Sequence, residues 1–217
     1  MNIVKTFRKL LSANQKIVKF IKHSLVKYKL RKSGFKNTNK IPTFTSKDEL
    51  FKLHELAISC PPNANAVEIG SYLGASTCYI AAGLNGKNAS LYCIDTWQNE
   101  TMPDGIKDTF SSFLKNISKS KTKIIKIRKN SLDVKRQELP LSVEFAFIDG
   151  DHSFASVRND VKLIEILMSK DSILAFHDAI YFKGVSMMIG EVLKGGHWRL
   201  EGQVNNLVWL RKYQFKQ

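Results

Sequence analysis

The sequence predicts an α/β domain, a mostly parallel sheet with helices packed on both of its faces. Short β-rich runs alternate with longer helical runs from residue 66 onward, which is typical of parallel strands joined by helices. Only Val204–Asn206 separate the last two predicted strands, and so short a connection makes an antiparallel pair. With 217 residues, 43% of them hydrophobic, the chain suits one three-layer domain with a terminal extension.

The first forty residues predict a helical extension to this domain. Apolar residues recur at helical spacing through residues 2–32, and lysine and arginine fill most of the gaps. Residues 33–45 are mostly polar and contain a glycine and a proline, which is typical of a linker. We therefore place a basic amphipathic extension at residues 1–40 and the main domain at residues 41–217.

The elements of the main domain follow in chain order. A first helix is expected from Ser46 to Ser59, because two acids fall in its first turn and two prolines follow it. The predicted strands are Ala66–Ile69, Leu91–Asp95, Lys123–Arg128, Val143–Ile148, Ile173–Phe176, Trp198–Gln203 and Leu207–Arg211. The predicted helices between them are Ser76–Leu84, Asp104–Ser118, Phe154–Met168 and Val185–Leu193.

The positive charge of the chain is concentrated in the extension. The formal net charge is +15, and residues 1–40 hold twelve Lys and Arg and no acid, so the remainder carries 22 basic against 19 acidic residues. A global nucleic-acid binder spreads its basic surface over the fold, which makes nucleic acid an unfavoured partner. No apolar run approaches the roughly 18 residues of a membrane-spanning helix. Three cysteines without C-x-x-C spacing indicate reduced thiols in a cytoplasmic protein.

The first chemical signal follows the first predicted strand, in the run Glu68-Ile69-Gly70-Ser71-Tyr72-Leu73-Gly74. Gly70 permits a tight turn, and Gly74 permits a close backbone approach at the start of a helix. Glu68 would repel a pyrophosphate but suits a ligand with a cationic amino acid head group, held directly or through water. The alternative is an ordinary strand-turn-helix junction.

Polar residues that fit a nucleoside end the second and third strands. Asp95 is placed to bind a ribose diol through charge-assisted hydrogen bonds, and Trp97 to stack on or flank an adenine. Ser131 follows the third strand, in a turn that would edge the same ring. Capping is the alternative role for Asp95 and Ser131, and simple packing for Trp97.

Acids and imidazoles gather at the ends of the fourth and fifth strands. Carboxylates and imidazoles are ligands for Mg²⁺, Mn²⁺ or another divalent cation. Alternatively, a histidine serves as a general base near neutral pH, or the residues cap helices and satisfy one another, as Asp151 or Ser153 would do for the following helix. The residues of this cluster are Asp149, Asp151, His152, His177 and Asp178.

Taken together, the run from Val67 to about Gly184 resembles the class I S-adenosylmethionine-dependent methyltransferases. It is closest to a small O-methyltransferase-like branch with an "IDGDHSY" segment, here IDGDHSF, and an "HD" strand end. It is also similar to caffeoyl-CoA and catechol O-methyltransferases, whose first motif reads E-I-G-x-x-x-G. The resemblance implies a Rossmann-like three-layer sandwich whose seven-stranded sheet has the order 3-2-1-4-5-7-6.

The resemblance also implies roles for single residues. Asp95 would bind the ribose of S-adenosyl-L-methionine, and Asp149 matches the first metal ligand of the catechol-type enzymes. His177 and Asp178 stand where those enzymes have Asp followed by Asn, a departure that bears on the metal. The expected cofactor-binding residues are Glu68, Gly70, Ser71, Tyr72, Gly74, Ser76, Asp95, Thr96, Trp97, Ser131 and Asp149. The expected catalytic residues are His152, His177 and Asp149, and the expected metal ligands are Asp149, His177 and Asp178.

The expected function is O-methylation of a small-molecule or sugar hydroxyl with S-adenosyl-L-methionine. Either a divalent metal or a histidine base would assist loss of the hydroxyl proton. The alternatives are a non-catalytic cofactor-binding or scaffold protein on the same fold, another nucleotide-dependent Rossmann enzyme, and a methyltransferase that acts on nucleic acid.

Three roles remain open for the basic extension. Residues 1–32 suit peripheral contact with an anionic membrane, the inner surface of the cytoplasmic membrane. They also suit packing on the chain's own domain or a homodimer contact. The third role is contact with nucleic acid.

Overall fold

The computed structural model describes residues 17–213 except 19 and 101–104. Its centre is a seven-stranded sheet of order β3-β2-β1-β4-β5-β7-β6. Neighbouring strands from β3 to β5 run parallel, whereas β7 is antiparallel to both β5 and β6. The predicted fold class and strand order are therefore confirmed.

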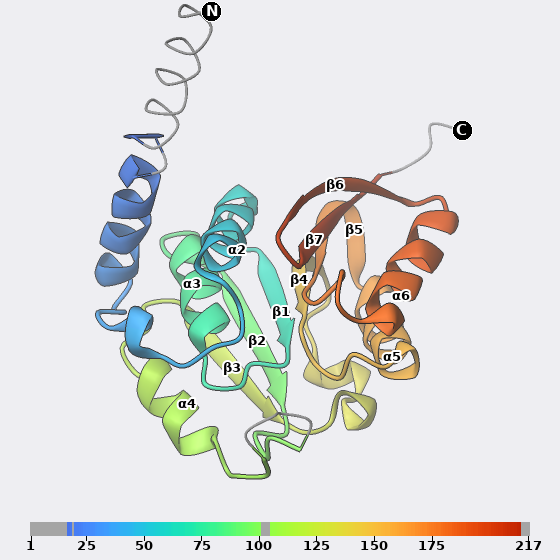
Figure 1. Cartoon of the computed structure of the whole chain (residues 1–217), viewed down its shortest axis with the longest axis horizontal. Helices are drawn as coiled ribbons and strands as arrows, with labels where there is room; N and C mark the ends of the chain where they lie inside the picture. The colour runs from blue at the N-terminus through green and yellow to red at the C-terminus, as the bar shows by residue number, and fades with distance from the viewer. Residues whose placement is uncertain (1–16, 19, 101–104, 214–217) are drawn as a thin grey trace, which may run out of the picture.

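The predicted elements lie close to those of the structure (Figure 1). The strands are β1 Asn65–Ile69, β2 Ser90–Asp95, β3 Lys123–Arg128, β4 Val143–Ile148, β5 Met168–Phe176, β6 Trp198–Val204 and β7 Leu207–Lys212. The α-helices of the main domain are α2 Lys47–Ser59, α3 Ala75–Leu84, α4 Phe110–Ile117, α5 Phe154–Glu165 and α6 Lys183–Lys194. Three short 3₁₀ helices complete them: η1 Thr38–Lys40, η2 Ser131–Asp133 and η3 Arg136–Glu138.

The sheet separates two hydrophobic clusters, which accounts for its uninterrupted apolar strands. Along β4, Phe145 and Phe147 face the cluster under α2, α3 and α4, while Ala146 and Ile148 face the cluster under α5 and α6. Successive side chains of a strand point to opposite faces. A strand covered on both sides is therefore apolar throughout, and helices cover both faces in Figure 1.

Helix α4 begins later than the predicted Asp104–Ser118. Residue 104 lies outside the described residues, and Gly105 has φ +83°, which a helix does not accommodate. The following loop turns back on the end of β2, because Lys107 and Thr109 donate backbone hydrogen bonds to the carbonyls of Gln98 and Trp97.

Strand β5 begins earlier than the predicted Ile173, and α5 ends earlier than the predicted Met168. Val143 of β4 pairs with Met168, but Phe145 pairs with Ile173, so β5 contains extra residues at this point. Asp171 lies within this irregularity and has φ +68°. A bulge of this kind interrupts the apolar pattern, and Ser169, Lys170 and Asp171 therefore did not indicate a strand.

The extension packs on the main domain through its described residues. Residues 17, 18 and 20–32 are helical, and Val26, Leu30 and Phe35 belong to the same cluster as α2 and α3. The predicted residues 2–16 and 19 lie outside the described residues, and the division at residue 40 stays a prediction. In the described part of the chain, no helix has the length and apolar character needed to cross a bilayer.

Candidate active site

The carboxyl ends of β1, β2, β4 and β5 meet at one edge of the sheet. Ile69 pairs with Ile94 on one side and with Ile148 on the other. The next residues are tied across the strands, since Gly70 N donates to Ile94 O (2.9 Å), and Asp149 N donates to Ile69 O (2.8 Å). His177 N donates to Ile148 O in the same way (3.1 Å). The glycine turn, Asp95, Asp149 and His177 thus border one region.

The turn between β1 and α3 requires its two glycines. Gly70 has φ +86°, and a Cβ there would lie 2.0 Å from the carbonyl oxygen of Asp149. Gly74 has φ +85° and caps α3, where a Cβ would lie 3.0 Å from the Phe113 ring. At Gly70 the backbone lies directly against the end of β4, and at Gly74 it lies against α4, so both positions need glycine for internal packing.

Glu68 lies beneath this turn and not at its surface. Its side chain is fully buried and accepts hydrogen bonds from Ser71 Oγ (2.8 Å) and from Thr77 Oγ1. Burial raises the pKa of Glu68, while hydroxyl donors, that of Ser76 first among them, oppose the rise. The carboxylate is enclosed and holds the turn to α3, and its expected contact with a ligand, direct or through water, stays a prediction.

Asp95 holds the turn from the neighbouring strand. Its Oδ2 accepts from Ser71 N (2.8 Å) and Tyr72 N (2.7 Å), and its Oδ1 accepts from Trp97 N (2.6 Å). Burial raises the pKa of Asp95, and these backbone hydrogen bonds oppose the rise. A carboxylate offers about four acceptor positions, so the half-buried Asp95 keeps capacity for a diol.

Trp97 is a core residue in this structure. Its side chain is fully buried, with the ring centroid 4.8 Å from Phe110 and 4.6 Å from Phe113. The ring thus packs against the helix α4, and its expected place at or beside an adenine stays a prediction. Its neighbour Thr96 is partly exposed and donates to Glu100 Oε2 (2.7 Å).

Ser131 opens η2 after β3 and bonds to an acid that the sequence analysis missed. That acid is Asp160 of α5, whose side chain is 2% exposed. Burial raises the pKa of Asp160 to about 7, although the hydrogen bond from Ser131 lowers it. The signal in the sequence was an acid beside Val157, Val161 and Ile164 on the buried face of a helix.

Asp149, His177 and Asp178 form a cluster that could hold a metal, with one ligand atom of each within 4.8 Å of the others. His177 Nδ1 lies 3.1 Å from Asp149 Oδ1 and 3.3 Å from Asp178 Oδ2. Its Nε2 lies 3.3 Å from Glu49 Oε2, and Glu49 is a buried residue of α2 that sequence reasoning missed. Only the tertiary fold brings Glu49 to β5.

The surroundings of His177 favour the protonated, positively charged form of its ring. Burial opposes the charge, but Asp149 and Asp178 raise the pKa of His177 to about 11. Both ring nitrogens face carboxylates, and the side chain is 3% exposed. When the ring is protonated, both of its nitrogens are donors, and the role of His177 as a general base stays a prediction. The chemistry of the donor set nevertheless fits a hard divalent ion, which would displace the ring proton.

His152 and Asp151 have different surroundings. The side chain of His152 is 28% exposed, its Nε2 lies 3.3 Å from Asp178 Oδ2, and its ring packs on Phe182 at 4.3 Å. Asp151 accepts from Ser153 N (2.9 Å) and Ser156 Oγ (2.9 Å), so it caps α5 together with Ser153. The structure therefore joins His152 to the cluster but leaves Asp151 in the helix cap.

Comparison with known proteins identifies a domain and a fold. A family model described as a methyltransferase domain matches residues 67–179, which contain the glycine turn and the acidic cluster. No curated protein matches the sequence.

Solved structures share the fold at low sequence identity. A putative caffeoyl-CoA O-methyltransferase from Staphylococcus aureus is 16% identical with a TM-score of 0.64, covering 92% of this chain and 99% of that one. An SAH-bound methyltransferase from Podospora anserina is 12% identical with a TM-score of 0.63, covering 86% and 88%. A TDP-rhamnose 3′-O-methyltransferase of calicheamicin biosynthesis is 16% identical with a TM-score of 0.56, covering 88% and 93%.

Proposed function

Since the chain belongs to this methyltransferase-domain family, we propose that it transfers a methyl group from S-adenosyl-L-methionine to a hydroxyl of a small molecule or sugar. The observation that carries the proposal is the meeting of four strand ends, those of β1, β2, β4 and β5. The glycine turn, the Asp95 carboxylate and the cluster around Asp149 adjoin one another through hydrogen bonds that backbone N–H groups donate. O-methyltransferases among the structures of the same fold support the choice of a hydroxyl acceptor.

The residues present fit the cofactor. The glycine turn from Gly70 to Gly74 would lie along the methionine moiety, and partly exposed Asp95 retains acceptor capacity for ribose hydroxyls. Ser131 at the end of β3 is partly exposed and adjoins the adenine end in this assignment. When bound, the cofactor supplies an activated methyl group on a sulfonium. The role of the chain is to orient the acceptor oxygen and to manage one proton.

The acidic cluster would assist the loss of the proton from the acceptor hydroxyl. Asp149, His177 and Asp178 would hold a divalent cation such as Mg²⁺ or Mn²⁺, which supplies Lewis-acid stabilisation of an ionised hydroxyl. Without a metal, His152 is the better base, because it is more exposed than His177 and Asp178 orients its ring. We favour the metal-assisted version, since three ligand atoms already lie close together.

Calorimetric titration with S-adenosylhomocysteine tests the cofactor site. Asp95→Ala and Asp95→Asn should weaken binding by about tenfold or more, because each removes one or two charge-assisted hydrogen bonds to the ligand. Glu191→Ala, at an exposed acid of α6, is the control and should bind as the unaltered chain does. Equal affinity in all four proteins, each with a cooperative melt, would refute the cofactor assignment.

Titration with Mn²⁺ in the absence of cofactor tests the metal site. Binding should be lost in Asp178→Asn and retained in His152→Gln, because His152 contacts the cluster only through Asp178. If the unaltered chain binds no Mn²⁺ and forms S-adenosylhomocysteine equally well in EDTA, the metal-assisted version fails and His152 becomes the base.

A further inference from the structure

The helix of the extension, described for residues 17, 18 and 20–32, has one face docked on the main domain. Val26 and Leu30 are buried in the cluster of α2 and α3. The His23 ring lies 4.1 Å from the Phe51 ring, and His23 Nε2 lies 3.6 Å from Asp48 Oδ1. These contacts fix the rotation of the helix about its own axis, and so they decide which side chains face outward.

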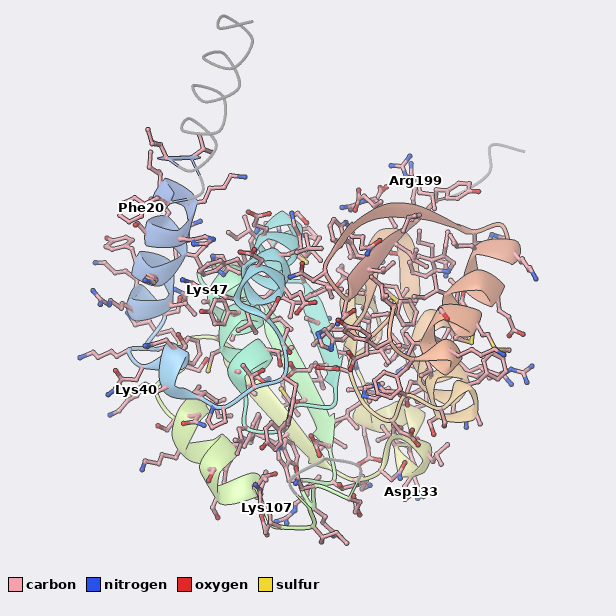
Figure 2. The ribbon with its side chains drawn as sticks, in the orientation of Figure 1. Phe20, Lys40, Lys47, Lys107, Asp133 and Arg199 are labelled. Atoms are coloured by element: carbon pink, nitrogen blue, oxygen red, sulfur yellow. The ribbon has the colours of Figure 1, made fainter. Side chains whose placement is uncertain are left out.

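The opposite face carries an apolar stripe that is exposed to solvent. At about 100° per residue, Ile17, Ile21, Leu25 and Tyr28 fall within an arc of about 80°, on the far side from Val26. Their exposed fractions are 56%, 51%, 55% and 58%. We call these four residues the outer stripe. Phe20, 71% exposed, lies beside it and points away from the molecule in Figure 2.

Cationic side chains border the outer stripe on both sides. At the same angular spacing, Lys22 and Lys29 follow one edge of the stripe, and Lys27 and Arg31 lie beyond the other. Residues 1–40 hold twelve Lys and Arg and no acid. An apolar stripe between two basic borders is typical of a helix that lies in the plane of a membrane interface.

A basic cavity adjoins one border of the stripe. It has a volume of about 440 Å³ between the helix, the segment around η1 and helices α2 and α3. Lys27, Arg31, Lys36 and Lys47 line it, and no acidic residue does among those that the structure describes. Leu50 and Tyr79 contribute to its inner wall. Its four cations and neighbouring threonine hydroxyls are suited to phosphate oxygens.

We propose that the outer stripe binds the surface of an anionic lipid bilayer and that the basic cavity takes lipid phosphate groups at the same surface. A second copy of the chain would bring the same excess of positive charge to the contact. Nucleic acid would leave Ile17, Ile21 and Leu25 of the outer stripe without an apolar partner. An anionic bilayer alone satisfies both the stripe and its cationic borders. The proposal does not depend on the proposed methyl transfer.

Co-sedimentation of the full chain with vesicles tests the proposal. The chain should pellet with vesicles of phosphatidylcholine mixed with phosphatidylglycerol, and much less with phosphatidylcholine alone. Serine at Ile17, Ile21 and Leu25 together should weaken binding more than about tenfold, because three aliphatic side chains lose their burial. The control is Leu141→Ser with Ile166→Ser, which changes side chains that are 91% and 75% exposed elsewhere; it should pellet as the unaltered chain does.

The basic cavity is tested separately, through two of the lysines that line it. Lys36→Gln with Lys47→Gln should reduce binding to the anionic vesicles by about fivefold for each lysine, with an unchanged melting temperature. Equal pelleting of the stripe variant and the unaltered chain overturns the proposal. The proposal is also overturned if the unaltered chain forms a dimer that the stripe variant does not form, because the outer stripe would then bind a second copy of the chain. Binding to a DNA duplex that competes fully with the vesicles and survives the stripe variant would assign the basic surface to nucleic acid, and it also overturns the proposal.

Discussion

Replacing Asp160 with asparagine should make the stability of this protein less dependent on pH. Asp160 lies on α5 with 2% of its surface exposed. Its Oδ1 has no hydrogen-bond partner among the described residues. Burial raises its pKa to about 7, which Ser131 opposes and Asp151 reinforces. The fold therefore favours the protonated form of this carboxyl group below about pH 7.

The magnitude follows from the difference between the folded and unfolded pKa values. An unfolded Asp has a pKa near 3.9, so the shift is about 3 pH units, and each unit corresponds to about 1.4 kcal/mol. Because the folded pKa is the higher one, the folded state binds the extra proton. Stability falls as pH rises from about 4 to about 7 and is constant above that range. The full effect is about 4 kcal/mol.

Urea denaturation of the ligand-free protein measures this effect. Between about pH 5 and pH 8, the advantage of Asp160→Asn over the unaltered chain should grow by about 3 kcal/mol, or by about 6–12 °C in melting temperature. Asp133→Asn, at an exposed acid of η2, should show no such growth. A difference between Asp160→Asn and the unaltered chain that stays constant with pH would show that Asp160 is ionised at little cost.

Three further substitutions test the site and the core. Gly70→Ala should destabilise the fold by more than about 1 kcal/mol, since its Cβ would meet Asp149 O at 2.0 Å. It should also abolish S-adenosylhomocysteine binding measured by calorimetry. The control Gly86→Ala, with a similar φ of +82° and open space around the Cβ, should bind S-adenosylhomocysteine as the unaltered chain does. Leu53→Ala should cost about 2–5 kcal/mol in urea denaturation, because its side chain is fully buried, and a loss under 1 kcal/mol would contradict that packing. Ser153→Ala should lower the unfolding free energy by about 1 kcal/mol through loss of its α5 cap, with no change expected in cofactor affinity.

Local sequence patterns were sufficient to predict the sheet and the positions of its polar strand ends. Apolar runs such as Val143–Ile148 can be buried only between two layers of helices. The glycine turn after Ile69 and the acids at Asp95 and Asp149 follow such runs directly, so their place at one edge of the sheet follows from the parallel strands. The bulge in β5 escaped prediction, because Ser169–Asp171 lack the strand pattern on their own.

The order of residues along the chain is enough to place particular residues at the strand ends, whereas the direction in which their side chains point depends on the packing of the folded chain. Glu68 and Trp97 were expected at the ligand, but the packing of α3 and α4 encloses both. Glu49 meets His177 across 128 residues of chain, a contact that no local pattern encodes. The physical reason is that spacing along a strand sets position and alternation, whereas burial and charge depend on neighbours from distant elements that reach the same place only after folding.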